Sequence, residues 1–139
     1  MLNVYLAGAV RGSQGTWRDQ VPEIPNVCFI HPGARIPGGN EERRSDLYCP
    51  ADRISVQKCD ILLAHCDRLE GGHGTAVEIG MALAYGKEIF LVCPNEESRY
   101  IWRFSVGSTP TVYDSLEAAL EVIRYAAAQV SGTSRCAAP

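Results

Sequence analysis

The chain has 139 residues, of which 46% are hydrophobic and 21% charged, and its formal net charge is -3. This length fits one domain with its own core, and the composition excludes a coiled coil, collagen or a largely disordered chain. The weakly acidic charge argues against a nucleic-acid polymer as the main partner, because phosphate backbones require a basic face, but it allows a small anionic ligand.

Membrane and secreted proteins are also disfavoured. No apolar run approaches the roughly 20 residues of a membrane span. Residues 1–10 are apolar without a preceding basic residue, so we interpret them as a strand and not as a signal peptide. Cys28, Cys59, Cys66 and Cys93 lie in or beside apolar runs, with no C-x-x-C pair. We therefore expect buried thiols in a reducing cytoplasm and no disulfide framework. We also expect no metal site, no cofactor and no membrane partner.

Short apolar runs alternate with helical patterns along the chain. The apolar runs are continuous, which indicates strands that are buried on both faces and therefore a parallel sheet. The expected strands are residues 3–7, 27–30, 61–64, 88–93 and 111–113.

Helical patterns fill the gaps between these strands. One helix is predicted over residues 75–85, ending at Gly86, and another over 115–129, with Asp114 as its N-cap and Glu117 three residues further on. Weaker helices are expected over 17–23 and over 50–58, the second with Pro50 in its first turn, and irregular segments over 32–44 and 95–110.

The alternation predicts a single α/β domain over residues 1–130, a doubly wound open sheet of about five parallel strands, followed by a flexible tail over 131–139. Ligands of such folds bind beyond the carboxyl ends of the strands. This rule nominates four segments, residues 8–14, 31–40, 66–75 and those from 94 onward.

A glycine-rich turn, Gly71 to Gly74, leads from the third strand into a helix. It lacks the Gly-Lys-Ser/Thr of a Walker A loop, and Val77 stands where a dinucleotide fingerprint needs its third glycine or alanine. Bare glycines and free helix N–H groups make Gly72, His73 and Gly74 candidates for binding an anionic substrate, although a histidine in a loop often has no such role.

Glu78 has two interpretations. The sequence Thr75-Ala-Val-Glu78 fits a capping box, in which the glutamate accepts a hydrogen bond from the Thr75 N–H. The alternative is a carboxylate that faces a cleft and acts as a nucleophile or base. From these residues alone the capping role is favoured.

Three further charged residues are ambiguous in the same way. Asp52, in the first turn of an expected helix, either complements the helix dipole or handles protons. Asp67 follows the third strand and is either solvated or in contact with substrate. Arg11 follows the first strand and is either a surface residue or a clamp for a phosphate or carboxylate.

Taken together, these features resemble the nucleoside 2-deoxyribosyltransferase family. The resemblance covers residues 2 to about 94, and its most specific part is the Gly-Thr-x-x-Glu-Ile-Gly-x-Ala stretch. The matching pieces are Tyr5-Leu6-Ala7-Gly8, Trp17-Arg18, Asp52, residues 59–64, residues 74–82 and residues 86–92.

The resemblance implies a flavodoxin-like fold and an enzyme that cleaves N-glycosidic bonds. By resemblance, Glu78 is the nucleophile on the anomeric carbon, Tyr5 orients its carboxylate, and Asp52 handles protons on the base. The implied partners are a nucleoside or nucleotide and a free nucleobase. A homodimer or larger homo-oligomer is also implied, because the family completes its site with a neighbour's C-terminal loop.

Some positions depart from the transferase pattern. Transferases often carry an aspartate six residues before the glutamate, and the related deoxynucleoside-monophosphate N-glycosidases a serine, whereas this chain has Gly72. The stretch from Gly8 to Arg11 partly resembles the substrate loop of those glycosidases, and Ser108 resembles their phosphate-binding serine region. The expected function is therefore transfer of 2-deoxyribose between bases, with hydrolysis of nucleoside 5′-monophosphates or non-catalytic nucleotide binding as alternatives.

Overall fold

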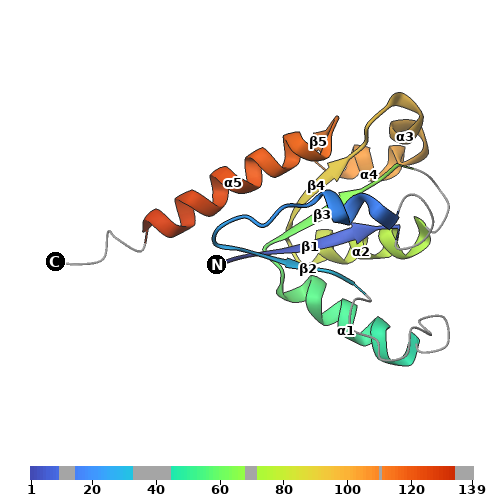
Figure 1. Cartoon of the computed structure of the whole chain (residues 1–139). Helices are drawn as coiled ribbons and strands as arrows, with labels where there is room; N and C mark the ends of the chain where they lie inside the picture. Colours follow the sequence, from blue (N-terminus) through green and yellow to red (C-terminus); the bar gives the residue numbers. More distant parts are fainter. Residues whose placement is uncertain (10–14, 33–44, 68–71, 110, 134–139) are drawn as a thin grey trace.

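Within the described residues, five parallel strands form one sheet at the centre of the molecule (Figure 1). The computed structural model describes residues 1–9, 15–32, 45–67, 72–109 and 111–133. The strands are β1 (Leu2–Gly8), β2 (Val27–Ile30), β3 (Ile61–His65), β4 (Glu88–Val92) and β5 (Val112–Tyr113). They pair in the order β2-β1-β3-β4-β5 with every neighbouring pair parallel, so the expected fold class is confirmed.

Helices cover both faces of this sheet. They are η1, a 3-10 helix (Gly15–Gln20), α1 (Ser45–Lys58), α2 (Gly72–Ala84), α3 (Glu96–Ile101), α4 (Arg103–Ser108) and α5 (Leu116–Thr133). Side chains of α1 and α2 pack on one face, which we call the α2 face. Side chains of α5 and η1 pack on the other, the α5 face. Within the part of the chain that the structure describes, no helix combines the length and the apolar character needed to cross a membrane.

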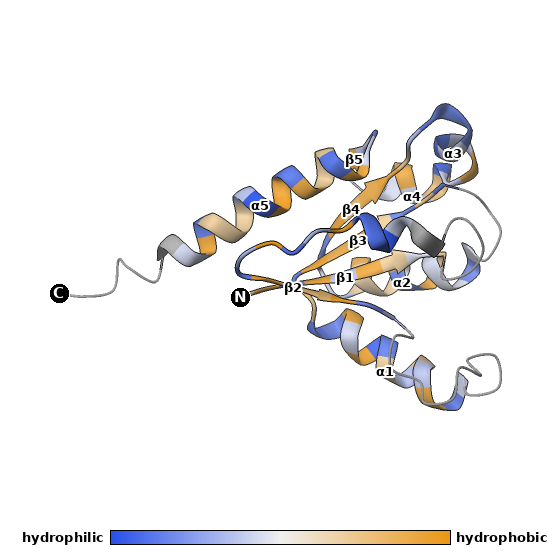
Figure 2. Cartoon of the chain, in the orientation of Figure 1, coloured by the Kyte–Doolittle hydropathy of each residue, from blue (hydrophilic) through white to orange (hydrophobic). Residues whose placement is uncertain are grey.

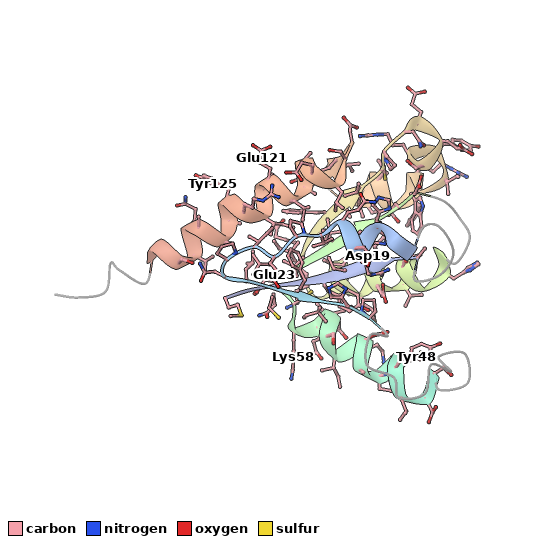
Figure 3. All side chains as sticks on the ribbon, in the orientation of Figure 1. Asp19, Glu23, Tyr48, Lys58, Glu121 and Tyr125 are labelled. Atoms are coloured by element: carbon pink, nitrogen blue, oxygen red, sulfur yellow. The ribbon has the colours of Figure 1, made fainter. Side chains whose placement is uncertain are left out.

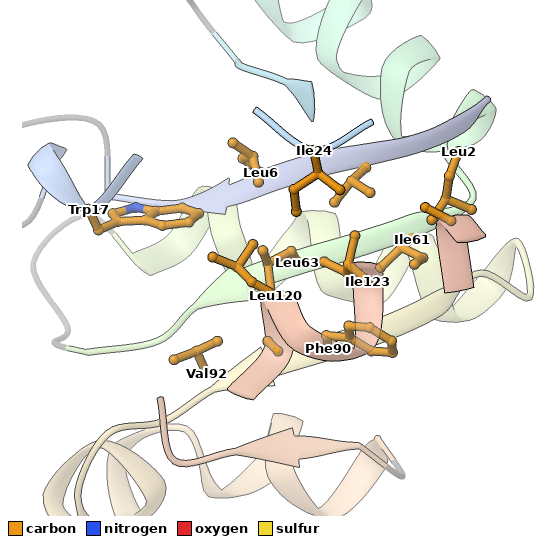
Figure 4. Packing of buried hydrophobic residues seen from close by; sticks show 13 residues of the cluster. Leu2, Leu6, Trp17, Ile24, Ile61, Leu63, Phe90, Val92, Leu120 and Ile123 are labelled. Atoms are coloured by element: carbon orange, nitrogen blue, oxygen red, sulfur yellow. The ribbon is translucent and has the colours of Figure 1, made fainter. Parts of the chain in front are cut away.

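The strand residues alternate between these two faces, as the twofold repeat of a strand requires. Val4 and Leu6 of β1 belong to the cluster on the α5 face (Figure 4), whereas Tyr5 and Ala7 belong to the cluster on the α2 face. The central strands are apolar along their length (Figure 2), because both of their sides are covered. This explains why the sequence shows continuous apolar runs and not alternating ones.

Three of the four thiols that the sequence predicted to be buried lie in the core. Cys59, Cys66 and Cys93 are buried, as expected. Cys28 is exposed, so that prediction is wrong. It lies on β2, the edge strand of the sheet, whose residues are less buried than those of the central strands.

Two helices occupy a segment that the sequence predicted to be irregular. In α3 the side chain of Asn95 accepts a hydrogen bond from the Ser98 N–H at 2.8 Å, and Ser98 completes a capping box with the Asn95 backbone. The prediction of an irregular segment over 95–110 is therefore wrong. The Asn-x-x-Ser spacing is too short a signal to reveal a helix of six residues.

The starts of two other helices also differ from the predictions. Helix α1 begins at Ser45, so Pro50 lies inside the helix and not in its first turn. At the start of α5 the hydroxyl of Ser115 accepts a hydrogen bond from the Ala118 N–H at 3.2 Å. The predicted N-cap, Asp114, instead forms an ion pair with Arg99. Helix α5 extends beyond the predicted end, to Thr133.

Candidate active site

A hydrogen bond between β1 and α2 lies at the centre of the candidate site. The Tyr5 hydroxyl donates to Oε1 of Glu78 at 2.8 Å. Tyr5 is fully buried on the α2 face, and Glu78 is half-buried. Helix α2 begins three residues before Thr75, so Thr75 lies inside the helix and cannot be its N-cap. The capping-box interpretation of Glu78 is therefore wrong.

The surroundings of Glu78 change its acidity. Burial raises the pKa of Glu78 to about 7. The hydrogen bond from Tyr5 lowers this pKa, the charge of Asp52 raises it, and the charge of Arg18 lowers it. Burial, followed by the charge of Glu78, also raises the pKa of Tyr5, so the phenol stays protonated and remains a donor. The carboxyl group therefore titrates near neutral pH beside a fixed hydrogen-bond donor.

Asp52 is brought to the same place by α1. Helices α1 and α2 pack against each other, and Asp52 lies about halfway along α1 and is half-buried. Its charge contributes to the pKa shifts of Tyr5, Arg18 and Glu78, which places it in the same electrostatic cluster. The structure thus gathers from three separate elements the three residues that the resemblance nominated as catalytic.

Gly8 ends β1 in a conformation that depends on glycine. Its φ is +145°, and a Cβ at this position would lie 3.0 Å from Nε1 of Trp17 and 3.1 Å from the His65 carbonyl oxygen. The Trp17 indole stacks on the His65 ring with a centroid separation of 5.1 Å. Gly8 is therefore required by packing, whether or not it also contacts substrate.

Arg18 reaches the same strand end from η1. Its guanidinium donates to the carbonyl oxygens of Leu6, Gly8 and Ala9 at 2.9, 3.1 and 2.6 Å, and the residue is buried. The family resemblance includes Trp17-Arg18, but it implies no role for Arg18. These contacts join residues that are nine to twelve positions apart, and no local pattern in the sequence indicates them.

Three of the predicted substrate-binding residues lie in the first turn of α2. His73 and Gly74 are exposed there, and a Cβ at Gly74 would meet nothing within 4 Å. Gly72 is different, because a Cβ there would lie 3.0 Å from Cζ2 of the Trp102 indole. Trp102 thus fills the space that an aspartate or serine side chain would need at position 72. The sequence did not suggest this contact between α2 and the residue that joins α3 to α4.

The remaining predicted binding residues are less closely connected to Glu78. Asp67 follows β3 and is half-buried. It affects the neighbouring His65, because burial lowers the pKa of His65 and the charge of Asp67 opposes that change. Ser108 ends α4, and its hydroxyl donates to the Phe104 carbonyl oxygen at 2.7 Å. Arg11 lies outside the described residues.

A sequence model for the nucleoside 2-deoxyribosyltransferase family matches residues 4–121, which include every residue of the cluster around Glu78. The chain belongs to this family. The family predicted from the combined matching pieces of the sequence is thereby confirmed.

Solved structures share the fold of this family member. A conserved protein from Enterococcus faecalis V583 superimposes with a TM-score of 0.69 at 20% identity, covering 87% of this chain and 96% of its own. The 2-deoxyribosyltransferase of Leishmania mexicana gives 0.65 at 18% identity, covering 90% and 98%. The 2-deoxyribosyltransferase of Bacillus psychrosaccharolyticus gives 0.62 at 19%, covering 84% and 89%.

One curated protein shares a short segment. It is the human spectrin beta chain, non-erythrocytic 5, which is 36% identical over 55 residues. This segment is 40% of the family member described here but only 2% of the spectrin chain, and it carries no argument about function.

Histidine, cysteine and acidic side chains are the possible metal ligands in the described part of this family member. Among residues 1–9, 15–32, 45–67, 72–109 and 111–133, no group of three or more histidine, cysteine or acidic side chains is arranged to hold a metal ion.

Proposed function

We propose that this chain is a nucleoside 2-deoxyribosyltransferase in which Glu78 is the nucleophile. It would cleave the N-glycosidic bond of a 2′-deoxynucleoside and transfer the sugar to a second base. The observation that carries the proposal is the 2.8 Å hydrogen bond from the buried Tyr5 hydroxyl to Oε1 of Glu78. Family membership supports it, because the match spans all of the elements that build this cluster.

The nucleophilic step follows from the geometry of the carboxylate. The Tyr5 bond holds Oε1 and fixes the rotation of the group, which leaves Oε2 as the atom to form the bond with the anomeric carbon. Departure of the base develops positive charge on the sugar, and a nearby carboxylate stabilises and then captures this centre. The product is a glycosyl ester of Glu78, and the carbon–nitrogen bond to the base is broken.

Asp52 is the proposed proton donor and acceptor. A departing base carries away the bonding electron pair and leaves more easily when it is protonated. Asp52 would supply that proton in the first half-reaction and recover one from the incoming base in the second. Its charge acts on Glu78, which supports a role for both carboxyl groups at one substrate.

Substrate contacts are proposed for the residues around this cluster. Gly8 ends β1, Asp67 follows β3, and Gly72, His73 and Gly74 begin α2, so all of them lie at the carboxyl edge of the sheet. Arg11 and Ser108 stay predictions from the sequence. A cytoplasmic location also stays a prediction.

Self-association is a further part of the proposal. Helices α1 and α2 expose apolar side chains that a second copy of the chain would bury, since Ile54 is 51% exposed and Val77 63%. Tyr85, just after α2, is 46% exposed. We expect a homodimer or larger homo-oligomer. Sedimentation equilibrium measures this directly, and a monomer at the enzyme concentrations used in activity assays would contradict it.

A base-exchange assay tests the proposed function. The protein is mixed with a 2′-deoxynucleoside and a different free base, and the expected product is the exchanged deoxynucleoside. Glu78→Gln should lower the rate by at least about a hundredfold. The matched control is Glu121→Gln, an exposed glutamate on α5 (Figure 3), which should leave the rate unchanged.

Two results would contradict the proposal. An unchanged exchange rate in Glu78→Gln would remove the nucleophile. Free 2-deoxyribose, formed at a rate independent of the acceptor base, would replace transfer by hydrolysis.

A further inference from the structure

Strand β1 extends beyond its neighbour β2 at the edge of the sheet where the candidate site lies. The last pair between the two strands is Tyr5 with Ile30, whereas β1 continues to Gly8. On its other side β1 remains paired with β3 up to Gly8 and His65. Among the described residues, no strand pairs with the outer side of the last three residues of β1.

The hydrogen bonds of β1 show which of its backbone groups point to that side. The Leu2 N–H donates to Asn26, which precedes β2, and alternate residues of a strand direct their N–H and carbonyl groups to the same side. The Asn3 carbonyl accepts from Asp60, which precedes β3. The carbonyls of Leu6 and Gly8 therefore point towards the space beyond the end of β2.

Arg18 occupies this space. One of its terminal nitrogens donates to Leu6 O at 2.9 Å and to Gly8 O at 3.1 Å, and the other donates to Ala9 O at 2.6 Å. The guanidinium carbon also lies 4.8 Å from the centre of the Trp17 ring. A side chain thus replaces the missing continuation of β2 and satisfies carbonyls that would otherwise be buried without partners.

The charge of Arg18 is not needed for this contact, because a neutral amide also donates hydrogen bonds to carbonyls. A buried cation carries a desolvation penalty, and burial indeed lowers the pKa of Arg18, while the charges of Glu78 and Asp52 oppose that change. The positive charge is therefore balanced by the acidic groups of the site. In return, it opposes the rise in the pKa of Glu78 that burial causes.

We propose that Arg18 is a positioning residue of the Glu78 centre, which fixes the end of β1 beyond β2 and supplies the positive charge that favours the ionised nucleophile. This inference rests on the proposed function, because it assigns Arg18 a role in keeping Glu78 reactive. It acts through the backbone and the electric field and touches no reacting atom, so its loss should lower kcat much more than it changes KM.

The other groups that face Glu78 define what must be kept constant in a test. Among the described residues these are Tyr5 from β1 and Asp52 from α1. The α2 face also contains aliphatic side chains of β3 and β4 and the thiols of Cys66 and Cys93, which follow these strands. None of them is changed by a substitution at position 18.

Two variants separate the charge of Arg18 from its hydrogen bonds. Arg18→Lys keeps the charge, whereas Arg18→Gln keeps a donor and removes the charge; Arg18→Met is a second neutral variant in case the first does not fold. The ¹³C signal of the Glu78 side-chain carboxyl, assigned by its absence in Glu78→Gln, is titrated in each protein. The same proteins give kcat and KM against pH. Arg124→Met is the control, since it removes an exposed arginine on α5.

We expect the neutral variant to move the midpoint of the Glu78 titration to higher pH by roughly half a unit to one unit. The acidic limb of the profile of kcat/KM against pH should move by the same amount. Arg18→Lys should keep the midpoint of the original protein while kcat falls, because its ammonium group cannot form the same fork of hydrogen bonds. Arg124→Met should change neither. A neutral variant that only loses thermal stability, with an unmoved midpoint, would overturn the inference. Because the NMR titration needs no turnover, it distinguishes this failure from an enzyme that does not depend on Glu78.

Discussion

The two faces of the sheet are built from alternate residues of the same strands, yet they differ in chemistry. The cluster on the α5 face consists of aliphatic and aromatic side chains from the sheet, η1 and α5. The cluster on the α2 face includes the Tyr5 phenol and three thiols and borders Glu78 and Asp52. The comparison indicates that one face consists of apolar packing, whereas the other carries the groups that we propose to be reactive.

This division has a physical reason. Ionising a buried carboxyl group opposes folding, and the pKa of Glu78, which burial raises to about 7, reports that penalty. Burial of apolar area on the α5 face offsets it without placing polar groups there. Three predictions test the comparison, from the largest expected effect to the smallest.

The first prediction compares two neighbouring leucines of β3. Leu62 faces α2 and Leu63 faces α5, and both are 0% exposed. Truncating either to alanine should reduce the free energy of unfolding by about 2–5 kcal/mol, because each leaves a cavity. Only Leu62→Ala should also lower kcat, since Leu62 belongs to the cluster that contains Tyr5. Urea unfolding and the base-exchange rate measure the two effects. Equal losses of kcat in folded samples of both variants would show that the faces do not divide these roles.

The second prediction concerns the stability of Glu78→Gln. The folded-state pKa of Glu78, about 7, lies above its ordinary value of 4.5, so the native state binds the proton more tightly than the unfolded state. The original protein therefore loses stability as pH rises from about 4.5 to 7, and the variant does not. At pH 8 the variant should be more stable by up to about 3 kcal/mol, with a much smaller difference at pH 4. Unfolding in urea at the two pH values measures this, with Glu121→Gln as the control. A pH-independent difference would contradict the burial of an ionisable nucleophile.

The third prediction concerns Tyr5→Phe. The lost hydrogen bond should reduce the free energy of unfolding by about 1 kcal/mol. It should also raise the pKa of Glu78 further, because the Tyr5 hydroxyl opposes the effect of burial. The acidic limb of the kcat/KM profile should therefore move to higher pH. Tyr125→Phe, which alters an exposed tyrosine on α5, should leave the profile in place.

Several features of the fold could be predicted from the sequence because their causes are local. The continuous apolar runs identified all five strands, since strands covered on both faces need apolar residues at every position. Gly86 correctly marked the end of α2, where its φ of +66° favours glycine. The family resemblance likewise nominated Tyr5, Asp52 and Glu78 together.

Other features were decided by the tertiary structure. Thr75-x-x-Glu78 satisfied a local capping pattern, yet the helix begins at Gly72 and Glu78 accepts its hydrogen bond from Tyr5, 73 positions away. Arg18 likewise contacts strand carbonyls that lack partners only because β2 ends before β1. The sequence by itself determined the strands, the end of α2 and the family, because these depend on residues close together in the chain. Only the tertiary structure decided the partners of Glu78 and Arg18, because strand register and helix packing bring distant residues into contact.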